Sequence, residues 1–262
     1  MLRALYTAAS GMEAQQLNID TIAHNLANIN TSGFKTRKAE FQDLLYQNVR
    51  QAGTANTSTT ELPVGLQVGL GTKPVASTII FSQGDFAATN NSLDMVIQGQ
   101  GFFPIRQSNG QLAYTRNGNF HLNSDGNIVT SEGDLIDPSV TIPPDQTSIS
   151  IGSDGTVSVT LPGQSEPQQV GQIQLSYFQN PSGLQNMGSS LFTPTQASGE
   201  AVTGTPGEDG LGSILSGYVE QSNVSVVEEM VNMIVSQRAY EANSKVIRTA
   251  DEMFTQANNV VR

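Results

Sequence analysis

Hydrophobic residues near the N-terminus recur at a spacing of seven. The series consists of Leu5, Met12, Ile19 and Leu26. Ile22 lies between the last two, so the steps alternate between three and four, which is typical of helices that pack against other helices. The first thirty residues contain no proline, and Gly11 is their only glycine. We predict a helical arm over residues 1–32, roughly 40 Å long at about 1.5 Å per residue.

The C-terminal end carries a longer series with the same spacing. Its members are Val226, Met233, Tyr240, Ile247, Phe254 and Val261. About forty residues here contain neither glycine nor proline. The pattern predicts a second helical arm over residues 220–262, with Asn223 or Ser225 as its N-cap. Glu228 and Glu229 would then lie in the first turn, where the helix dipole favours negative charge.

The pattern changes between Thr54 and Gly217. Short alternating apolar runs are separated there by Gly, Thr, Ser, Asn and Pro, and such runs are typical of strands. Predicted strands include residues 74–81, 93–97, 101–105 and 171–178. Asp125-Gly126 and Asp154-Gly155 predict tight hairpins. The fold class is therefore α+β, with long N- and C-terminal helices forming a coiled-coil-like arm pair around a central all-β domain over residues 72–219.

Residues 33–71 fit two interpretations. Lys38 to Arg50 has the spacing of a short amphipathic helix through Phe41, Leu44, Leu45 and Val49. The Thr-rich tract from Thr54 to Thr60 and the Gly-rich run from Val64 to Gly71 instead favour an extended connecting segment. Both interpretations stay open at the sequence level.

Charge is distributed unevenly along the chain. The net charge is −11, and residues 51–219 contribute −10 of it. An acidic surface repels phosphate groups, so nucleic acid and anionic lipid are excluded as partners. The two ends are close to neutral, as expected of surfaces that pack against copies of themselves.

The cysteine content and the absence of targeting signals restrict the possible classes of protein further. The chain has no cysteine, which removes disulfides and thiolate chemistry. No apolar stretch is long enough to span a bilayer, and no basic cluster precedes an apolar run near Met1. We expect a chain without a membrane span and without a cleaved signal peptide.

Residues with catalytic or metal-binding potential are few. His24 and His121 are the only histidines, and neither has an acidic residue at metal-ligand spacing. Gly99-Gln100-Gly101 begins like a dinucleotide fingerprint, but Pro104 stands at the third glycine position. The run from Asn123 to Asn127 lacks the later glycine and glutamate of a calcium loop and favours a hairpin. We expect no catalytic, cofactor-binding or metal site, and therefore a protein that is not an enzyme.

The order of helical end, β middle and helical end points to assembly. Each arm alone would expose its apolar series to water, and an isolated helix is marginal without tertiary burial. We therefore expect the arms to pack against neighbouring copies of the chain.

Several segments resemble a known family. Ile22 to Lys35 reads IAHNLANINTSGFK and resembles the N-terminal signature of bacterial flagellar rod and hook proteins, in which N-x-A-N leads into T-x-G-F. Asn232 to Ile247 resembles the paired C-terminal signature, and Leu93 to Phe103 and Tyr114 to Phe120 resemble the shared middle domain. The length of 262 residues and the run Leu62 to Gly71 resemble the distal-rod members more than the longer hook proteins.

This resemblance implies a structural subunit of the distal rod that polymerises helically through its terminal helices and transmits torque from motor to hook. Implied partners are further copies of the chain, proximal rod proteins, the hook protein, the ring (bushing) proteins around the rod and the type III export apparatus. The rod crosses the periplasm within the basal body. The alternatives are another axial subunit, either a proximal rod or hook protein, or a secreted β-rich binding module.

Signature residues complete the expected subunit interface. Side-chain amides at Asn25 and Asn28 can cap the first helix or bridge subunits, and Gly33 permits the positive φ at which a chain leaves a helix sharply. Phe34 follows in the same signature. We expect these residues, with Ile22 and the two series spaced by seven, to form contacts between subunits.

Overall fold

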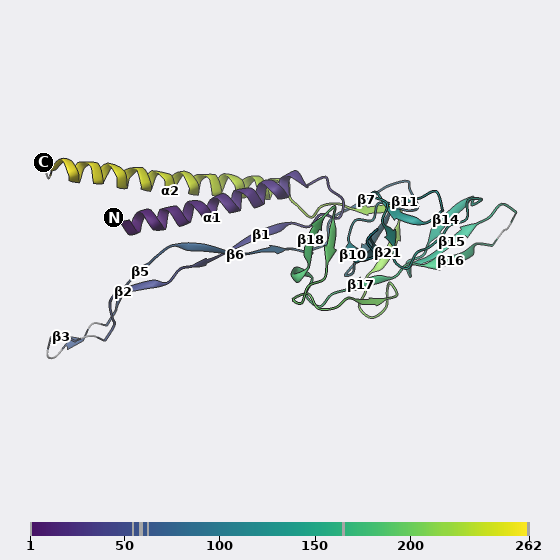
Figure 1. The fold of residues 1–262 in the computed structure, drawn as a ribbon, viewed down its shortest axis with the longest axis horizontal. Helices are drawn as coiled ribbons and strands as arrows, with labels where there is room; N and C mark the ends of the chain where they lie inside the picture. Colours follow the sequence, from purple (N-terminus) through teal and green to yellow (C-terminus); the bar gives the residue numbers. More distant parts are fainter. Residues whose placement is uncertain (1, 54, 58–59, 62, 164–165, 261–262) are drawn as a thin grey trace. The chain divides into compact units, whose positions relative to one another are not determined.

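The computed structural model describes residues 2–53, 55–57, 60–61, 63–163 and 166–260 (Figure 1). The chain forms two compact units. The arm unit contains Met1–Ala27, Arg37–Thr78 and Ser225–Arg262, and the β unit contains Asn28–Thr36 and Ile79–Val224. Val261, the last residue of the C-terminal series, lies outside the described residues.

Two long helices dominate the arm unit. Helix α1 (Leu2–Ala27) and helix α2 (Val226–Val260) lie side by side, with the start of α1 and the end of α2 at the same end of the pair (Figure 1). The backbone N–H of Glu229 donates to the carbonyl of Ser225 at 3.0 Å, so the first helical turn of α2 begins from Ser225. The two predicted helices are confirmed. In the described part of the chain, neither helix combines the length and apolar character needed to cross a membrane.

The rest of the arm unit is a narrow antiparallel ribbon (Figure 1). Its strand pairs are β1 (Arg37–Asp43) with β6 (Thr72–Ile79), β2 (Tyr46–Arg50) with β5 (Leu66–Gly69), and β3 (Ala55–Thr57) with β4 (Thr60–Glu61). The segment from Lys38 to Arg50 is therefore extended, and the amphipathic-helix interpretation is wrong. Its backbone groups pair with strands about thirty residues later, as in the 2.8 Å bond from Leu44 N–H to the Gly71 carbonyl.

The β unit is built around a seven-stranded antiparallel sheet with strand order β11-β12-β13-β9-β10-β19-β18. Its strands are β9 (Phe103–Arg106), β10 (Leu112–Thr115), β11 (Phe120–Leu122), β12 (Ile128–Thr130), β13 (Leu135–Ile136), β18 (Gln185–Gly188) and β19 (Leu191–Thr193). A three-stranded sheet contains β14 (Ser148–Ile151), β15 (Thr156–Thr160) and β16 (Gln168–Gln172).

Three two-stranded pairs complete the β unit. They join β7 (Phe86–Ala88) with β22 (Tyr218–Glu220), β8 (Met95–Gln98) with β21 (Ser213–Ser216), and β17 (Leu175–Tyr177) with β20 (Val202–Gly204). A short 3-10 helix, η1 (Pro181–Gly183), follows β17. The hairpins predicted at Asp125-Gly126 and Asp154-Gly155 are confirmed as the β11–β12 and β14–β15 turns.

Two apolar clusters hold the β unit together. The larger includes Met95, Phe103, Ile105, Phe120 and Ile128, all with almost no exposed surface. The smaller is aromatic, and in it Phe102 packs edge-to-face on Phe81, Phe178 and Phe192 with ring centroids 5.3–6.1 Å apart. Edge-to-face contacts between aromatic rings fix side-chain orientation as well as burying area. The β unit thus provides a firm frame for the polar groups buried beside it.

Candidate functional site

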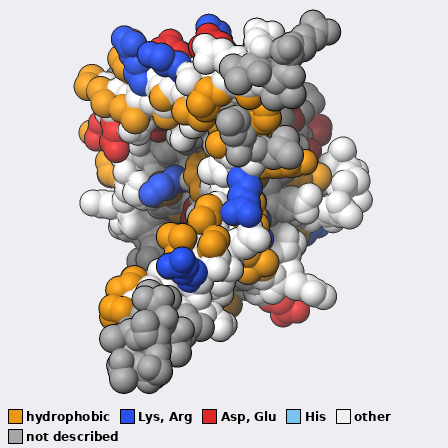
Figure 2. All heavy atoms as spheres, turned by 90° about the vertical axis from the view of Figure 1, so that its left-hand side faces the viewer, with side chains coloured by type: hydrophobic (Ala, Val, Ile, Leu, Met, Phe, Trp, Pro, Cys, Tyr) orange, Lys and Arg blue, Asp and Glu red, His pale blue; other side chains and the backbone are white. Residues whose placement is uncertain are grey.

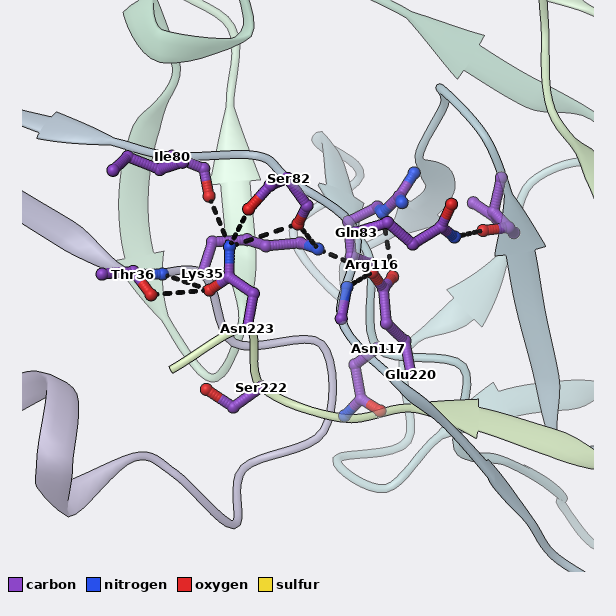
Figure 3. A network of polar contacts seen from close by, with 12 residues as sticks. Lys35, Thr36, Ile80, Ser82, Gln83, Arg116, Asn117, Glu220, Ser222 and Asn223 are labelled. Atoms are coloured by element: carbon purple, nitrogen blue, oxygen red, sulfur yellow. Dashed lines mark hydrogen bonds and ion pairs between the residues drawn. The ribbon is translucent and has the colours of Figure 1, made fainter. Parts of the chain in front are cut away.

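A buried polar network in the β unit surrounds Glu220, the last residue of β22 (Figure 3). Its carboxylate accepts hydrogen bonds from Lys35 Nζ at 2.6 Å and from Arg116 Nε at 3.1 Å. It also accepts a hydrogen bond from the Gly84 backbone N–H at 3.0 Å. The three charged side chains are almost wholly shielded from solvent. Ionised side chains are rarely buried without such pairing, because desolvating an unpaired charge is costly.

Two cations share this one carboxylate. Arg116 spreads its remaining hydrogen bonds over the carbonyls of Gly99 and Gly101, at 2.9 and 2.7 Å. Lys35 donates to the Ser82 carbonyl at 2.8 Å. Burial lowers the pKa of Lys35, the Glu220 carboxylate opposes this effect, and the nearby Arg116 lowers the pKa further. Glu220 is therefore the group on which both buried cations depend.

Asn223 extends the network three residues beyond Glu220 (Figure 3). Its Oδ1 accepts from the backbone N–H and the hydroxyl of Thr36, both at 2.7 Å. Its Nδ2 donates to the carbonyl of Ile80 at 2.9 Å and to the hydroxyl of Ser82 at 2.8 Å. With Glu220, it ties together residues 35–36, 80–82 and 220–223, the stretches by which the chain enters and leaves the β unit. The sequence suggested Asn223 as an N-cap of the C-terminal helix. In the structure its side chain instead makes the hydrogen bonds of this network.

Gly33 of the N-terminal signature lies against the same frame. Its φ of +69° lies in the left-handed region, where only glycine is unstrained. A Cβ at this position would lie 2.6 Å from the Asn117 backbone nitrogen, which leaves no room for a side chain. The Gly33 N–H donates to the Glu220 carbonyl at 2.8 Å. Asn28 accepts from the Thr31 hydroxyl at 3.2 Å, and Phe34 is half-buried.

The two helices of the arm unit meet along a seam with polar members. Asn25 is 1% exposed, and its Nδ2 donates to Glu229 Oε1 at 3.2 Å and to the Arg37 carbonyl at 2.8 Å. Its Oδ1 accepts from the Arg37 N–H at 2.9 Å. Further along, Asn18 Nδ2 donates to Ser236 Oγ at 2.8 Å. Asn25, expected to cap a helix or bridge subunits, thus joins three segments of one chain.

Most residues of the two apolar series are only partly buried in the single chain. Ile22 is buried, and Val226 and Tyr240 are exposed. The half-buried members are Leu5, Met12, Ile19, Leu26, Met233, Ile247 and Phe254. Fully buried positions of the helices include the small residues Ala8, Ala14, Ser236 and Ala250. The apolar series therefore retain surface that the chain itself does not cover.

An apolar surface covers the start of α2 on the side away from the seam. Val227 is 74% exposed and Ile234 is 56% exposed. This outer apolar face consists of Val226, Val227, Met230, Val231, Ile234 and Val235. Figure 2, which views the molecule from the end where α1 starts and α2 ends, shows further hydrophobic side chains at the surface there, among Lys and Arg side chains. Contiguous exposed apolar residues of this kind mark sites of protein association.

The later part of α2 has a different outer surface. Exposed charged residues dominate there, beside exposed Val246 and Met253, and they are Arg238, Glu241, Lys245, Arg248 and Glu252. Arg238 and Glu241 form an exposed ion pair at 3.5 Å, which contributes little to stability. The densest run of exposed apolar residues is thus in the first part of the helix.

Burial raises the pKa of Glu229, the neighbouring Glu228 adds to this effect, and the hydrogen bond from Asn25 opposes it. A carboxyl group whose pKa is raised in the folded state binds its proton more tightly in the folded state than in the unfolded state. Such a group therefore lowers the stability of the folded state at neutral pH, where it is ionised. This destabilisation disappears as the pH falls through the raised pKa of Glu229 towards 4.5, the ordinary pKa of a glutamate. We predict that Glu229→Gln, which keeps an acceptor for Asn25, makes the helix pair more stable at neutral pH.

Thermal unfolding followed by helical circular dichroism tests this prediction. The advantage of Glu229→Gln over the native chain should shrink as the pH is lowered towards 4.5. Glu241→Gln, at an exposed position of the same helix, is the matched control and should leave the profile unchanged. A difference between Glu229→Gln and the native chain that stays constant with pH would show that Glu229 titrates normally.

Comparisons with known proteins place three matches along the chain. Residues 5–35 match the flagella basal body rod protein family, 96–159 the flagellar hook protein FlgE/F/G D1 domain, and 215–260 the flagellar basal body rod FlgEFG protein C-terminal family. The flagellar basal-body rod protein FlgG of Borreliella burgdorferi is 50% identical over all of both chains. That of Caulobacter vibrioides is also 50% identical over all of both chains. That of Buchnera aphidicola subsp. Schizaphis graminum is 48% identical over 97% of this chain and 98% of its own.

Long terminal helices flanking a β unit, with these matches in chain order, define an axial protein of the flagellar rod and hook class. Identity near 50% over whole chains makes the assignment more specific. The chain belongs to the flagellar basal-body rod protein FlgG family.

Proposed function

We propose that this chain is a structural subunit of the flagellar distal rod, which polymerises helically through its terminal helices and transmits torque from motor to hook. The observation that carries the proposal is the outer apolar face of α2, exposed on a helix of 35 residues in a chain that matches a rod protein along that protein's whole length. A helix that exposes apolar side chains away from its own partner requires further partners to cover them.

The terminal segments 1–32 and 220–262 form the inner tube of this polymer, where helices of neighbouring copies pack in a coiled-coil-like manner. Residues 72–219 form the outer domain, and residues 33–71 connect the two. The near-neutral ends and the acidic middle support this division, since packed surfaces carry little net charge. The expected subunit contacts at the half-buried apolar series fit the same arrangement.

The proposed function is mechanical, and the protein is not an enzyme. Among the described residues, no three side chains of the metal-binding types His, Asp and Glu come together. The buried Lys35–Glu220–Arg116 network has the character of a structural joint, since all three groups are satisfied by one another and by backbone atoms. In the rod, this joint would hold the β unit firm where the arm segments leave it.

The proposed neighbours follow from the position of a distal rod in the flagellum. Proximal rod proteins lie below it, the hook protein above it and the ring proteins around it, as it crosses the periplasm. The chain reaches this place through the flagellar type III export apparatus. A cysteine-free chain suits such a route, because it forms no disulfides while unfolded.

Electron microscopy of basal bodies in cells lacking this gene tests the proposal. We expect a shaft that ends before the outer membrane and carries no hook, with normal structures restored by the native gene. A complete rod without a hook would instead identify a hook protein, and a shorter stub a proximal rod protein. Flagella of normal appearance would favour a secreted β-rich binding module.

A further inference from the structure

Three pairs of residues cross the seam between α1 and α2 at a constant register. Asn25 faces Glu229, Asn18 faces Ser236, and Gly11 faces Asn243. Each step of seven towards the C-terminus of α1 is matched by a step of seven towards the N-terminus of α2. Equal and opposite steps are what an antiparallel helix pair requires. This set of pairs is called the polar ladder below.

The members of the polar ladder fit one another in size. The space beside Gly11 holds the Asn243 side chain, since a Cβ on Gly11 would lie 2.9 Å from Asn243 Nδ2. In the next pair the larger residue is on α1 and the smaller on α2, with Asn18 Nδ2 on Ser236 Oγ at 2.8 Å. In these two pairs, therefore, the larger residue lies on opposite helices.

We propose that the polar ladder selects the seam face of α2 as the surface on which α1 packs, in one register, and so reserves the outer apolar face of α2 for other copies. The selection of face and register stands on the contacts of the arm unit alone. Its consequence for assembly rests on the proposed function. The ladder residues are specificity-determining residues for arm pairing, while apolar contacts supply the affinity between copies.

A slip by seven residues breaks the ladder in either direction. In one direction Asn18 would face Asn243, so two amide side chains would meet without the space that Gly11 leaves for Asn243 in the native register. In the other direction Asn18 would face Glu229, and Gly11 would leave a void opposite Ser236. A buried polar group that loses its partner shifts the equilibrium by roughly tenfold or more per group. An apolar seam lacks this discrimination, because one buried Leu or Ile fits another in many registers.

The same reasoning distinguishes the two faces of α2. The outer apolar face offers no hydrogen-bonding groups to Asn18 or Asn25, so α1 pairs poorly with it. Buried polar residues in helix pairs are known to fix register and partner number at some cost in stability. The ladder thus disfavours packing of α1 on the outer apolar face of α2 when many arms are crowded together.

Disulfide trapping in the full chain tests the proposal, since the native chain has no cysteine. Ala4 and Ala250 occupy the next step of the ladder register, whereas Ala4 and Ala257 would meet only after a slip of seven. The two reporters are therefore Ala4→Cys/Ala250→Cys and Ala4→Cys/Ala257→Cys. Both replace alanine and leave the polar ladder intact. Each is oxidised in dilute solution, and links within and between chains are separated by electrophoresis.

With the native ladder, the yield of the disulfide between positions 4 and 250 of one chain should be roughly tenfold higher than the yield of the disulfide between positions 4 and 257. Replacing the polar side chains of two ladder pairs with alanine, as Asn18→Ala/Ser236→Ala/Asn243→Ala, should bring the two yields close together. Gln16→Ala/Gln237→Ala/Glu241→Ala is the matched control at exposed positions and should behave as the native ladder.

Two results would overturn the proposal. One is an alanine ladder that keeps the native preference, because apolar packing would then set the register. The other is a native ladder without any preference between the reporters. Neither result depends on where the protein acts in the cell, so the deletion experiment on rod structure fails or succeeds independently.

Discussion

Glu220→Gln is expected to destabilise the β unit by roughly 3–5 kcal/mol, the usual cost of removing one partner from a buried ion pair. The substitution leaves Lys35 and Arg116 buried without a counter-charge, while shape and volume barely change. The loss should be large relative to the whole stability of a domain, about 5–15 kcal/mol. Denaturant unfolding of the full chain, followed by the near-ultraviolet signal of the aromatic cluster, measures it.

Two comparisons make this prediction specific. Glu200→Gln, at an exposed carboxylate of the same unit, should change stability by less than about 0.5 kcal/mol. Lys35→Met should cost less than Glu220→Gln, because Arg116 still pairs with Glu220, and adding it to Glu220→Gln should recover part of the loss. If the Glu220→Gln variant proved as stable as the Glu200→Gln variant, the network would not be what holds the β unit together.

The helices and hairpins could be predicted because their signals are local. Series spaced by seven without proline predict α1 and α2, and Asp-Gly pairs predict the turns after β11 and β14. Such signals depend on residues within one or two turns of each other. The ribbon from Arg37 to Ile79 was ambiguous for the opposite reason, since β1 pairs with β6 about thirty residues later. The spacing of Phe41, Leu44 and Val49 fits one face of a helix equally well.

The buried network could not be predicted from sequence. Lys35, Arg116 and Glu220 are separated by about a hundred residues each, and no spacing marks them as partners. Only the folded β unit brings them within 2.6–3.1 Å. The polar ladder is a different case, because Gly11, Asn18 and Asn25 do recur at a spacing of seven. A search for apolar residues alone passes over a periodic signal carried by glycine, asparagine and serine.

The placement of the apolar series changes how they should be tested. Ile247 is half-buried in the single chain, so an acidic residue there would disturb the arm unit as well as contacts between copies. Ile234 is 56% exposed and lies on the outer apolar face. A substitution at Ile234 therefore separates assembly from folding.

Ile234→Asp is expected to abolish shaft assembly and motility while leaving the monomer folded. In the single chain the new carboxylate would remain in water, so helical circular dichroism and thermal unfolding should stay close to native. In the polymer it would be buried without a partner, at several kcal/mol for each subunit. The same free-energy cost recurs at every equivalent contact of a helical assembly. A loss of binding free energy at each interface therefore adds up to complete loss of the shaft.

Motility assays and electron microscopy of cells expressing only Ile234→Asp measure this outcome. Gln237→Asp, one turn later at an exposed polar position, is the matched control and should support normal shafts. Normal shafts built from Ile234→Asp would exclude the outer apolar face from the interface between copies. The remaining apolar surface of α2, which includes the half-buried Met233, Ile247 and Phe254 and the exposed Val246 and Met253, would then have to join neighbouring subunits.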